Sequence, residues 1–186
     1  MTSEARIAQV GGMTDGQAMR RVLGHFASGI VVVTARGDEG PIGFTCQSFA
    51  SLSLDPPLVT FAPALTSSTW PLIGRVGTFC VNVLAAGQEE LSAKFAVSGS
   101  DKFAGVSWQP DSAGSPALEG ACAWIGCDLH AEYAGGDHSI VVARVSYLAD
   151  EPNRAPLLFH RGRYGVLAGA ALPAQQGRGN RGEAGR

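Results

Sequence analysis

The strongest constraint on the fold is a series of strand-forming runs that follow one another through short connections and do not alternate regularly with helices. About seven such runs are expected, near 30–35, 41–46, 57–63, 78–84, 121–133, 138–149 and 157–160. The segments Gly37–Gly40 and Gly135–His138 contain residues typical of tight turns between antiparallel strands. A doubly wound parallel sheet requires a helix between successive strands, so we predict a mainly β (α+β) fold, an antiparallel barrel with helical inserts.

Three short helices are expected beside these strands. Thr14-Asp15 can cap a helix over 15–28 that Gly29 is suited to end, with apolar residues at helical spacing: Met19, Val22, Leu23 and Phe26. A second helix should begin near Ser68 or Thr69 and end near Arg75, and a third should span 88–95. Residues 97–120 are rich in Ser, Gly and Pro, and a long excursion of this kind is usually functional or mobile.

Composition narrows the class of protein. A chain of 186 residues is most simply one domain, which we place at 14–168 between a flexible tail at 1–13 and a disordered tail at 169–186. The net charge of −2 gives no electrostatic reason to expect nucleic acid or an anionic membrane as partner. Low charge with a mean hydropathy of +0.10 suggests that a second subunit covers some apolar surface.

The cysteines and histidines argue against disulfides and metal sites. Cys46, Cys80, Cys122 and Cys127 stand mostly in apolar runs without a Cys-x-x-Cys pair, which is typical of reduced core cysteines in a cytoplasmic protein. The four histidines are scattered, so no metal site is expected. The N-terminal segment does not resemble a signal peptide, and no apolar run approaches the roughly 20 residues that span a bilayer.

Familiar nucleotide and hydrolase motifs do not explain this chain. A literal G-x-G-x-x-G occurs at Gly177, Gly179 and Gly182, but it lies in a polar tail without the strand and helix that a dinucleotide site requires. The sequence contains no Walker A motif, no G-x-S-x-G and no H-E-x-x-H. A ligand, if bound, is therefore held in some other way.

A polar run interrupts the apolar pattern between 43 and 59. Small hydroxyl and amide residues stand here between two strands: Thr45, Gln47, Ser48, Ser51 and Ser53. Such a run offers donors, exposed backbone and little bulk, which suits a flat ligand with polar edges lying against a sheet. An ordinary Ser-rich loop is the alternative reading.

Three further segments are candidates for chemistry. Four consecutive hydroxyl residues at 66–69 exceed what a helix cap requires and could cradle a phosphate, while Trp70 fits either a core residue or a ligand contact. His138 follows a turn at a strand end, where it could hydrogen-bond a carboxamide or act as an acid, or simply belong to the hairpin. The segment Arg161–Tyr164 could close a pocket over an anion or form a solvated terminus.

Taken in order, these segments resemble the short-chain flavin reductase family, the reductase components of two-component flavin-dependent monooxygenases. The resemblance covers about residues 17–166 and is carried by seven segments: 24–34, 43–54, 57–59, 68–70, 79–84, 136–138 and 162–164. Within the family, the sequence is most similar to reductases that serve aromatic-ring or steroid-ring hydroxylases and natural-product monooxygenases of actinobacteria.

The resemblance implies a homodimeric split β-barrel that transfers hydride from NADH or NADPH to FAD or FMN. Residues implied to line the isoalloxazine are Thr45, Cys46, Gln47, Ser48, Ser51, Leu52 and Ser53. Those implied to hold the phosphate are Thr66, Ser67, Ser68, Thr69 and Trp70, and those implied to flank the ribityl side are Asn82, Val83 and Leu84. Phe95, Ala96, Lys102 and Phe103 match a segment that closes over the cofactor in relatives, His138 matches a nicotinamide-side catalytic histidine, and Tyr164 matches an aromatic near the same face.

The family chemistry implies no catalytic nucleophile, because the cofactors themselves carry out the redox step. The expected function is an NAD(P)H:flavin oxidoreductase that supplies reduced flavin to a partner monooxygenase. A non-catalytic flavin- or haem-binding module is the alternative from another class, and an oxidase of the pyridoxamine-phosphate type would need a more basic phosphate site. The motifs are compatible with flavin as a diffusing substrate and as a tightly bound group.

Overall fold

The structure is a computed structural model that describes residues 15–99 and 101–167. The predicted tails at 1–13 and 169–186, the capping residue Thr14 and the tail G-x-G-x-x-G motif lie outside the described residues. The described chain is mostly β-structure with three helices, as predicted.

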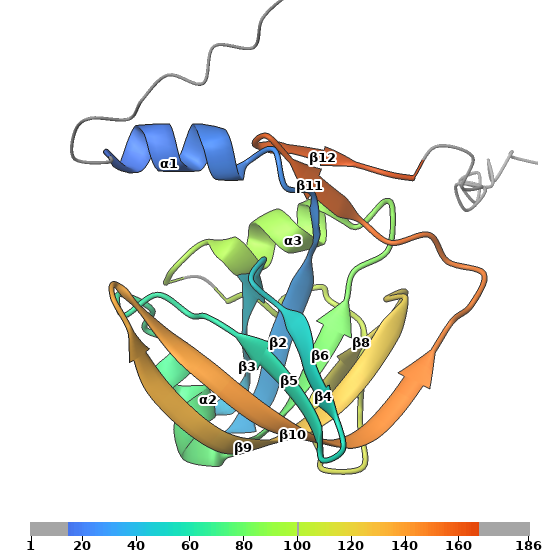
Figure 1. Ribbon diagram of the computed structural model, residues 1–186. Coiled ribbons are helices and arrows are strands. Elements are labelled where there is room, and N and C mark those ends of the chain that lie inside the picture. The colour runs from blue at the N-terminus through green and yellow to red at the C-terminus, as the bar shows by residue number, and fades with distance from the viewer. Residues whose placement is uncertain (1–14, 100, 168–186) are drawn as a thin grey trace, which may run out of the picture.

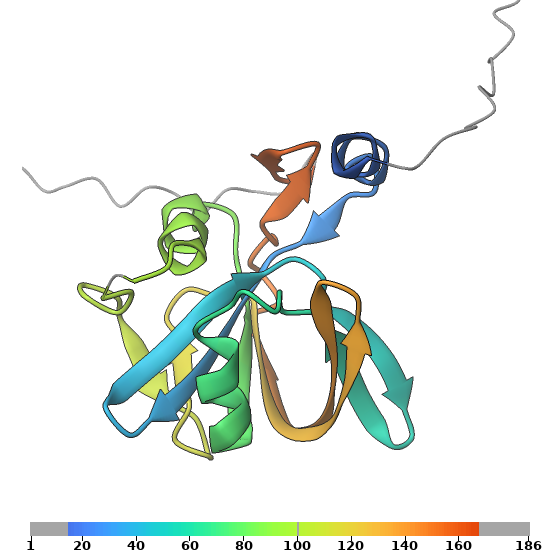
Figure 2. The ribbon, with the colours of Figure 1, turned by 90° about the vertical axis from the view of Figure 1, so that its left-hand side faces the viewer.

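The main layer is an antiparallel seven-stranded sheet with the order β3-β2-β6-β9-β10-β5-β4. Its strands are β2 (Val31–Gly37), β3 (Gly40–Cys46), β4 (Ala50–Leu54), β5 (Pro57–Phe61), β6 (Thr78–Val83), β9 (Ala123–Gly135) and β10 (His138–Asp150). The long β9–β10 hairpin bends sharply, so that the sheet curls round a common interior (Figures 1 and 2). Within the described residues β3 and β4 pair on one side only, which leaves an open, split barrel as expected.

Two small sheets accompany the main one. β1 (Ser28–Gly29), β11 (Leu158–His160) and β12 (Arg163–Gly165) form a three-stranded sheet above the barrel, and α1 (Gly16–Leu23) lies beside it (Figures 1 and 2). β7 (Trp108–Pro110) and β8 (Pro116–Leu118) pair with each other. They give order to part of the excursion that the sequence predicted at 97–120.

The helices begin close to the predicted positions. The Asp15 side chain accepts a hydrogen bond from the backbone N–H of Ala18 and so caps α1. The prediction that α1 runs to residue 28 is wrong: Gly24 is its C-cap, because Ser28 and Gly29 pair with β11 instead. α2 (Trp70–Val76) ends at Gly77, whose φ of 80° suits a glycine, and α3 spans Glu89–Ala96.

The interior contains two apolar clusters. The larger lies inside the curled sheet and under α2, where the rings of Phe44, Phe61, Trp70 and Phe79 pack at centroid distances of 5.3–6.4 Å, tilted for Phe44–Phe61 and edge to face for the other pairs. The smaller joins β2 and β6 to α3 and β8 through residues such as Phe95 and Leu118. Together the clusters fix the ends of β3, β5 and α3, which surround the site described next.

The cysteines have the predicted environment. Cys46, Cys80 and Cys127 are buried, Cys122 is half-buried, and all four are unpaired. Burial raises the pKa of the Cys127 thiol to about 12 and raises that of Cys80 still further. Among the described helices, none combines the length and apolarity needed to cross a membrane.

Candidate functional site

The main pocket has a volume of about 670 Å³ and opens where the ends of several strands meet. It is bounded by the end of β3, the 47–49 loop, the segment after β5, the 66–69 segment, the end of α3 and the tip of the β9–β10 hairpin. Its lining residues are Phe44, Thr45, Cys46, Gln47, Ser48, Ala62, Pro63, Ala64, Thr66, Ser67, Ser68, Thr69, Phe95, Ala96, Ser98, Lys102, Gly135 and His138. Uncharged residues with hydroxyl, amide and backbone groups therefore make up most of the wall.

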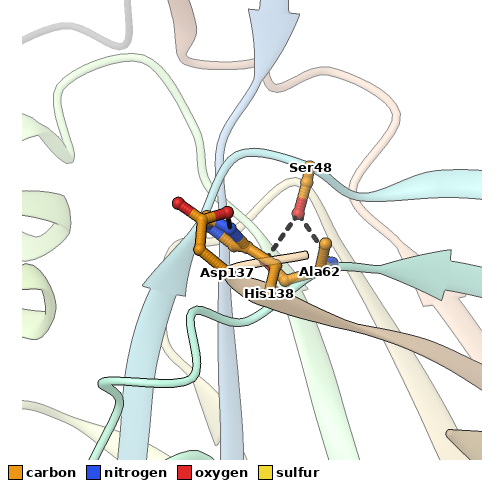
Figure 3. A network of polar contacts seen from close by, with 4 residues as sticks. All are labelled: Ser48, Ala62, Asp137 and His138. Carbon is orange, nitrogen blue, oxygen red and sulfur yellow. Dashed lines mark hydrogen bonds and ion pairs between the residues drawn. The ribbon is translucent and has the colours of Figure 1, made fainter. Parts of the chain in front are cut away.

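One side of the main pocket is built from the first part of the polar run. The Ser48 hydroxyl accepts a hydrogen bond from the Ala62 N–H at 2.7 Å and donates to the Ala62 carbonyl at 3.2 Å (Figure 3). These two bonds tie the loop after β3 to the end of β5. The Thr45 hydroxyl donates to the Ser92 carbonyl at 2.6 Å and thereby connects β3 to α3. The hydroxyls hold the wall in shape and leave neighbouring backbone groups facing the cavity.

The 66–69 segment carries several polar groups that have no hydrogen-bond partner among the described residues. The Ser67 hydroxyl accepts a hydrogen bond from the Trp70 N–H at 3.1 Å, so one hydroxyl caps the helix as the sequence suggested. Within the described residues, the hydroxyls of Thr66, Ser68 and Thr69 make no hydrogen bond, and neither do the N–H groups of Ser68 and Thr69. These donors line the pocket and remain available to an anionic or strongly accepting ligand.

Lys102 brings a cation to the same pocket. Its ammonium donates to the carbonyls of Gly43 and Phe95, each at 3.1 Å, which fastens the segment after α3 to β3. An ammonium group has three donors, so one remains for a ligand. Partial burial lowers the pKa of Lys102 from its ordinary value.

His138 stands at the rim of the pocket, on the first residue of β10. Its Nδ1 lies 2.7 Å from Oδ1 of Asp137, and its side chain is 43% exposed. Figure 3 shows the imidazole beside the Ser48–Ala62 contact. The hydrogen bond with His138 holds the pKa of the Asp137 carboxyl below its ordinary value. The pair orients the ring and leaves Nε2 free for a ligand.

The structure brings together about half of the residues that the sequence singled out. Those that line the main pocket are Thr45, Cys46, Gln47, Ser48, Thr66, Ser67, Ser68, Thr69, Phe95, Ala96, Lys102 and His138. Ser51, Leu52 and Ser53 lie instead in strand β4 and do not line it. The expectation that the polar run stands between two strands is therefore wrong for Ser51 and Ser53, because backbone pairing with β5 makes this part of the run an edge strand.

Several other singled-out residues lie in the interior. Trp70 is 5% exposed in the aromatic cluster, and its indole donates to Glu132 at 3.0 Å. Asn82 and Leu84 are fully buried, with Val83 packed against the core between them. None of these four side chains lines the main pocket.

Phe103 and Tyr164 also lie away from the main pocket wall. Phe103 packs edge to face on Phe95, with ring centroids 5.0 Å apart, and so supports a residue that does line it. Tyr164 packs edge to face on Phe159, and its hydroxyl donates to the Ser92 hydroxyl at 3.1 Å. Phe103 and Tyr164 therefore support the pocket through neighbouring residues and do not line it themselves.

Sequence reasoning missed six residues of the wall: Phe44, Ala62, Pro63, Ala64, Ser98 and Gly135. They carry apolar or small side chains, so nothing in their chemistry marks them as ligand contacts. Only their position next to the polar segments could have suggested them. Among the described residues, no group of three or more His, Cys, Asp or Glu side chains is placed to hold a metal ion.

Comparison with known proteins agrees with this geometry. The family model for the flavin reductase like domain matches residues 23–168. The reductase subunit HsaB of a flavin-dependent monooxygenase from Rhodococcus jostii is 47% identical over 161 residues, which cover 86% of this chain and 83% of the relative.

Solved structures give the same result. Nitrilotriacetate monooxygenase component B from Mycobacterium thermoresistibile superposes with a TM-score of 0.80 at 42% identity, covering 90% of this chain and 95% of the other. The NADH:FAD oxidoreductase SgcE6 of Streptomyces globisporus, in complex with NAD and FAD fragments, has a TM-score of 0.80 at 38% identity, covering 85% and 96%. The resemblance inferred from the sequence motifs is confirmed, and the chain belongs to the flavin reductase like domain family.

Proposed function

We propose that this chain is an NAD(P)H:flavin oxidoreductase that reduces FAD or FMN and supplies the reduced flavin to a separate flavin-dependent monooxygenase. The observation that carries the proposal is the main pocket, which joins the 45–48 wall, the spare donors of 66–69 and the rim histidine in one cavity. The names of HsaB, a monooxygenase reductase subunit, and of SgcE6, an NADH:FAD oxidoreductase, support the same reaction.

The residues present fit a flavin. A volume of about 670 Å³ is within the usual range for small-molecule and cofactor sites. The unpartnered hydroxyl and N–H donors of Ser68 and Thr69 suit a phosphate. The Lys102 ammonium adds one positive charge and one remaining donor. The wall at 45–48 offers backbone groups for the polar edge of a ring system.

The protein's own contribution is binding and orientation. A bound flavin supplies the hydride-accepting chemistry, and a nicotinamide nucleotide supplies the hydride. Ser48 keeps the wall rigid by its two bonds to Ala62, and Asp137 holds the ring of His138 by its contact with Nδ1. Since none of these side chains must act as a nucleophile, substitution of His138 should slow reduction without abolishing it.

The charge of the pocket fits a cofactor that is exchanged. Lys102 and His138 are the ionisable side chains among the described lining residues that can carry positive charge, and the remaining contacts are neutral. Neutral hydrogen bonds stabilise a phosphate less than bidentate arginine pairs do. Reduced flavin can therefore leave for a partner enzyme.

The assembly and location belong to the same proposal. We place the catalytic domain at 14–168 and expect it to form a homodimer, which is supported by exposed large apolar side chains such as Phe26 at 81%, Leu54 at 90% and Leu148 at 70%. Four unpaired cysteines support a cytoplasmic location. Static light scattering should give twice the mass of one chain.

The test is a direct assay of hydride transfer. The purified chain is mixed with FAD or FMN and with NADH or NADPH, and the absorbance of the nicotinamide is followed over time. Oxidation well above the buffer rate, and product formation when a flavin-dependent monooxygenase is added, would support the proposal. Tight flavin binding without nicotinamide oxidation would refute it and favour the non-catalytic flavin-binding module.

A further inference from the structure

Tyr164 connects the small sheet of β1, β11 and β12 to α3. Its hydroxyl donates to the Ser92 hydroxyl at 3.1 Å, although the two residues are 72 positions apart in the chain. Figure 1 shows the β11–β12 hairpin lying next to α3, and in Figure 2 both lie above the barrel. The bond therefore joins the last described strand to a helix whose end lines the main pocket.

The two hydroxyls stand in different surroundings. The Tyr164 ring packs edge to face on Phe159, with ring centroids 5.5 Å apart, and the residue is 39% exposed. Ser92 is 1% exposed and is, with Phe95, one of the buried residues of α3. Because the protein shields Ser92 from solvent, water replaces the bond poorly once the tyrosine hydroxyl is removed. The loss should therefore affect the position of α3.

Ser92 continues the connection to the wall of the main pocket. Its backbone carbonyl accepts a hydrogen bond from the Thr45 hydroxyl at 2.6 Å, and Thr45 lines the pocket. Ser92 thus accepts one bond from β12 through its side chain and one from β3 through its backbone. Phe95, three residues further along the same face of α3, lines the pocket as well. A single turn of α3 therefore links Tyr164 to two residues of the wall.

The contact between α3 and β3 leaves little free space. A Cβ on Gly43 would lie 2.9 Å from Cε1 of Phe95 and 3.0 Å from the Val33 carbonyl oxygen, so a glycine is needed for this close approach. The Lys102 ammonium adds hydrogen bonds to the carbonyls of Gly43 and Phe95. In a contact this close, a small displacement of α3 changes the distance between the Thr45 and Phe95 sides of the main pocket.

We propose that Tyr164 is a positioning residue for flavin: through Ser92 it holds α3 and Thr45 in the arrangement that binds the ring system. This inference rests on the proposed function and deepens it by adding a residue outside the wall of the main pocket. The family resemblance implied instead a place for Tyr164 near the nicotinamide face. The two roles predict different kinetics. A residue that acts through Ser92 changes flavin binding, whereas a residue beside the nicotinamide changes NADH binding.

The experiment measures the binding of oxidised FMN and FAD by flavin fluorescence, without turnover. Tyr164→Phe keeps the ring on Phe159 and removes only the hydroxyl, while Ser92→Ala removes the acceptor and keeps the carbonyl that Thr45 uses. Each variant should weaken flavin binding about fivefold, and the double variant should bind no more weakly than either single one, because both lose the same bond. Tyr147→Phe should bind as the wild type does, since the Tyr147 hydroxyl has no hydrogen-bond partner among the described residues and does not line the main pocket.

Steady-state kinetics separate the positioning role from the other roles of this residue. In Tyr164→Phe, the KM for flavin should rise about fivefold, while kcat and the KM for NADH stay within about twofold of the wild type. A lower unfolding temperature with unchanged flavin affinity would overturn the inference, and so would a raised KM for NADH with unchanged flavin affinity. Additive effects in the double variant would refute the path through Ser92. Failure of the wild type to oxidise NADH with either flavin would instead overturn the proposed function, whereas the flavin titrations would still test the role of Tyr164.

Discussion

Asn82 provides the sharpest test of which singled-out residues serve the fold and which serve the ligand. In the structure its Nδ2 donates to the Val32 carbonyl at 3.0 Å and to the Thr34 hydroxyl at 2.9 Å, and its Oδ1 accepts from the Leu118 N–H at 2.7 Å. The residue is fully buried and joins β2, β6 and β8. We therefore expect Asn82→Ala to destabilise the domain without altering the flavin site.

The magnitude follows from the three bonds. Each buried partner left unsatisfied is expected to destabilise the protein by about 1–3 kcal/mol, so Asn82→Ala should lower the free energy of unfolding by at least about 3 kcal/mol. This is a large part of the about 5–15 kcal/mol that stabilises a typical domain. Urea denaturation followed by tryptophan fluorescence measures the change. Asn153→Ala is the matched control, because Asn153 is exposed in a turn and should alter stability by less than about 0.5 kcal/mol.

Flavin titration completes this test. At urea concentrations where Asn82→Ala is folded, its affinity for FAD and FMN should lie within about twofold of the wild type, since distant sites act independently. A variant that keeps wild-type stability but loses flavin affinity would refute the structural role. It would return Asn82 to the ribityl-binding role that the family resemblance implied.

Three further predictions concern the pocket and the thiols. Lys102→Met should weaken FAD binding about tenfold, because it removes a charged donor and the bonds to Gly43 and Phe95. Lys94→Met is the control, because Lys94 also donates to a backbone carbonyl, that of Ala104, but does not line the main pocket. Equal FAD affinities of the two variants would contradict the role of Lys102. The pKa of the Asp137 carboxyl, measured by NMR, should lie below its ordinary value of 3.8. The contact between Asp137 and His138 then persists above the ordinary pKa and is lost as the pH falls through the lowered value. In His138→Gln the pKa of Asp137 should return toward 3.8. Iodoacetamide at pH 8 should leave buried Cys127, whose pKa is about 12, unmodified in the folded protein but not in urea.

The sequence predicted the elements whose pattern is local. The β9–β10 hairpin follows from β-forming residues on both sides of Gly135–His138, and the structure places its turn at the same point. α2 and α3 were located to within about two residues by their capping signals and apolar spacing. These features depend on neighbours in the chain, so the chain alone contains the information.

Two elements were missed or misplaced, one because of a distant partner and one because its apolar residues are not buried. The apolar spacing from Met19 to Phe26 continues past Gly24, but α1 ends there because Ser28 and Gly29 pair with β11 near the other end of the domain. Ser51 to Ser53 belong to strand β4, where Leu52 and Leu54 alternate with the serines but are exposed and so cover no core within the described chain. Its strand conformation comes from backbone bonds to β5, and an edge strand needs no buried face.

The position of a residue in the fold also explains which candidate site residues line the main pocket. Residues at 45–48 and 66–69 have polar side chains at strand and helix ends, where the fold exposes them, and they do line the main pocket. Asn82 carries an equally polar side chain but stands in a central strand between β2 and β9, where every one of its groups finds a partner in the interior. Residue type therefore identifies a ligand contact only together with its place in the strand order.

The positions of the perturbed titratable groups fit a reaction in which the protein moves no proton at a buried acid or base. The largest pKa shifts belong to Cys80 and Cys127, which lie in the core away from the main pocket. At the pocket itself, Lys102 donates hydrogen bonds to two backbone carbonyls, and Asp137 orients the ring of His138. Such groups fix distances and directions, which is the contribution that hydride transfer between two bound rings demands of a protein.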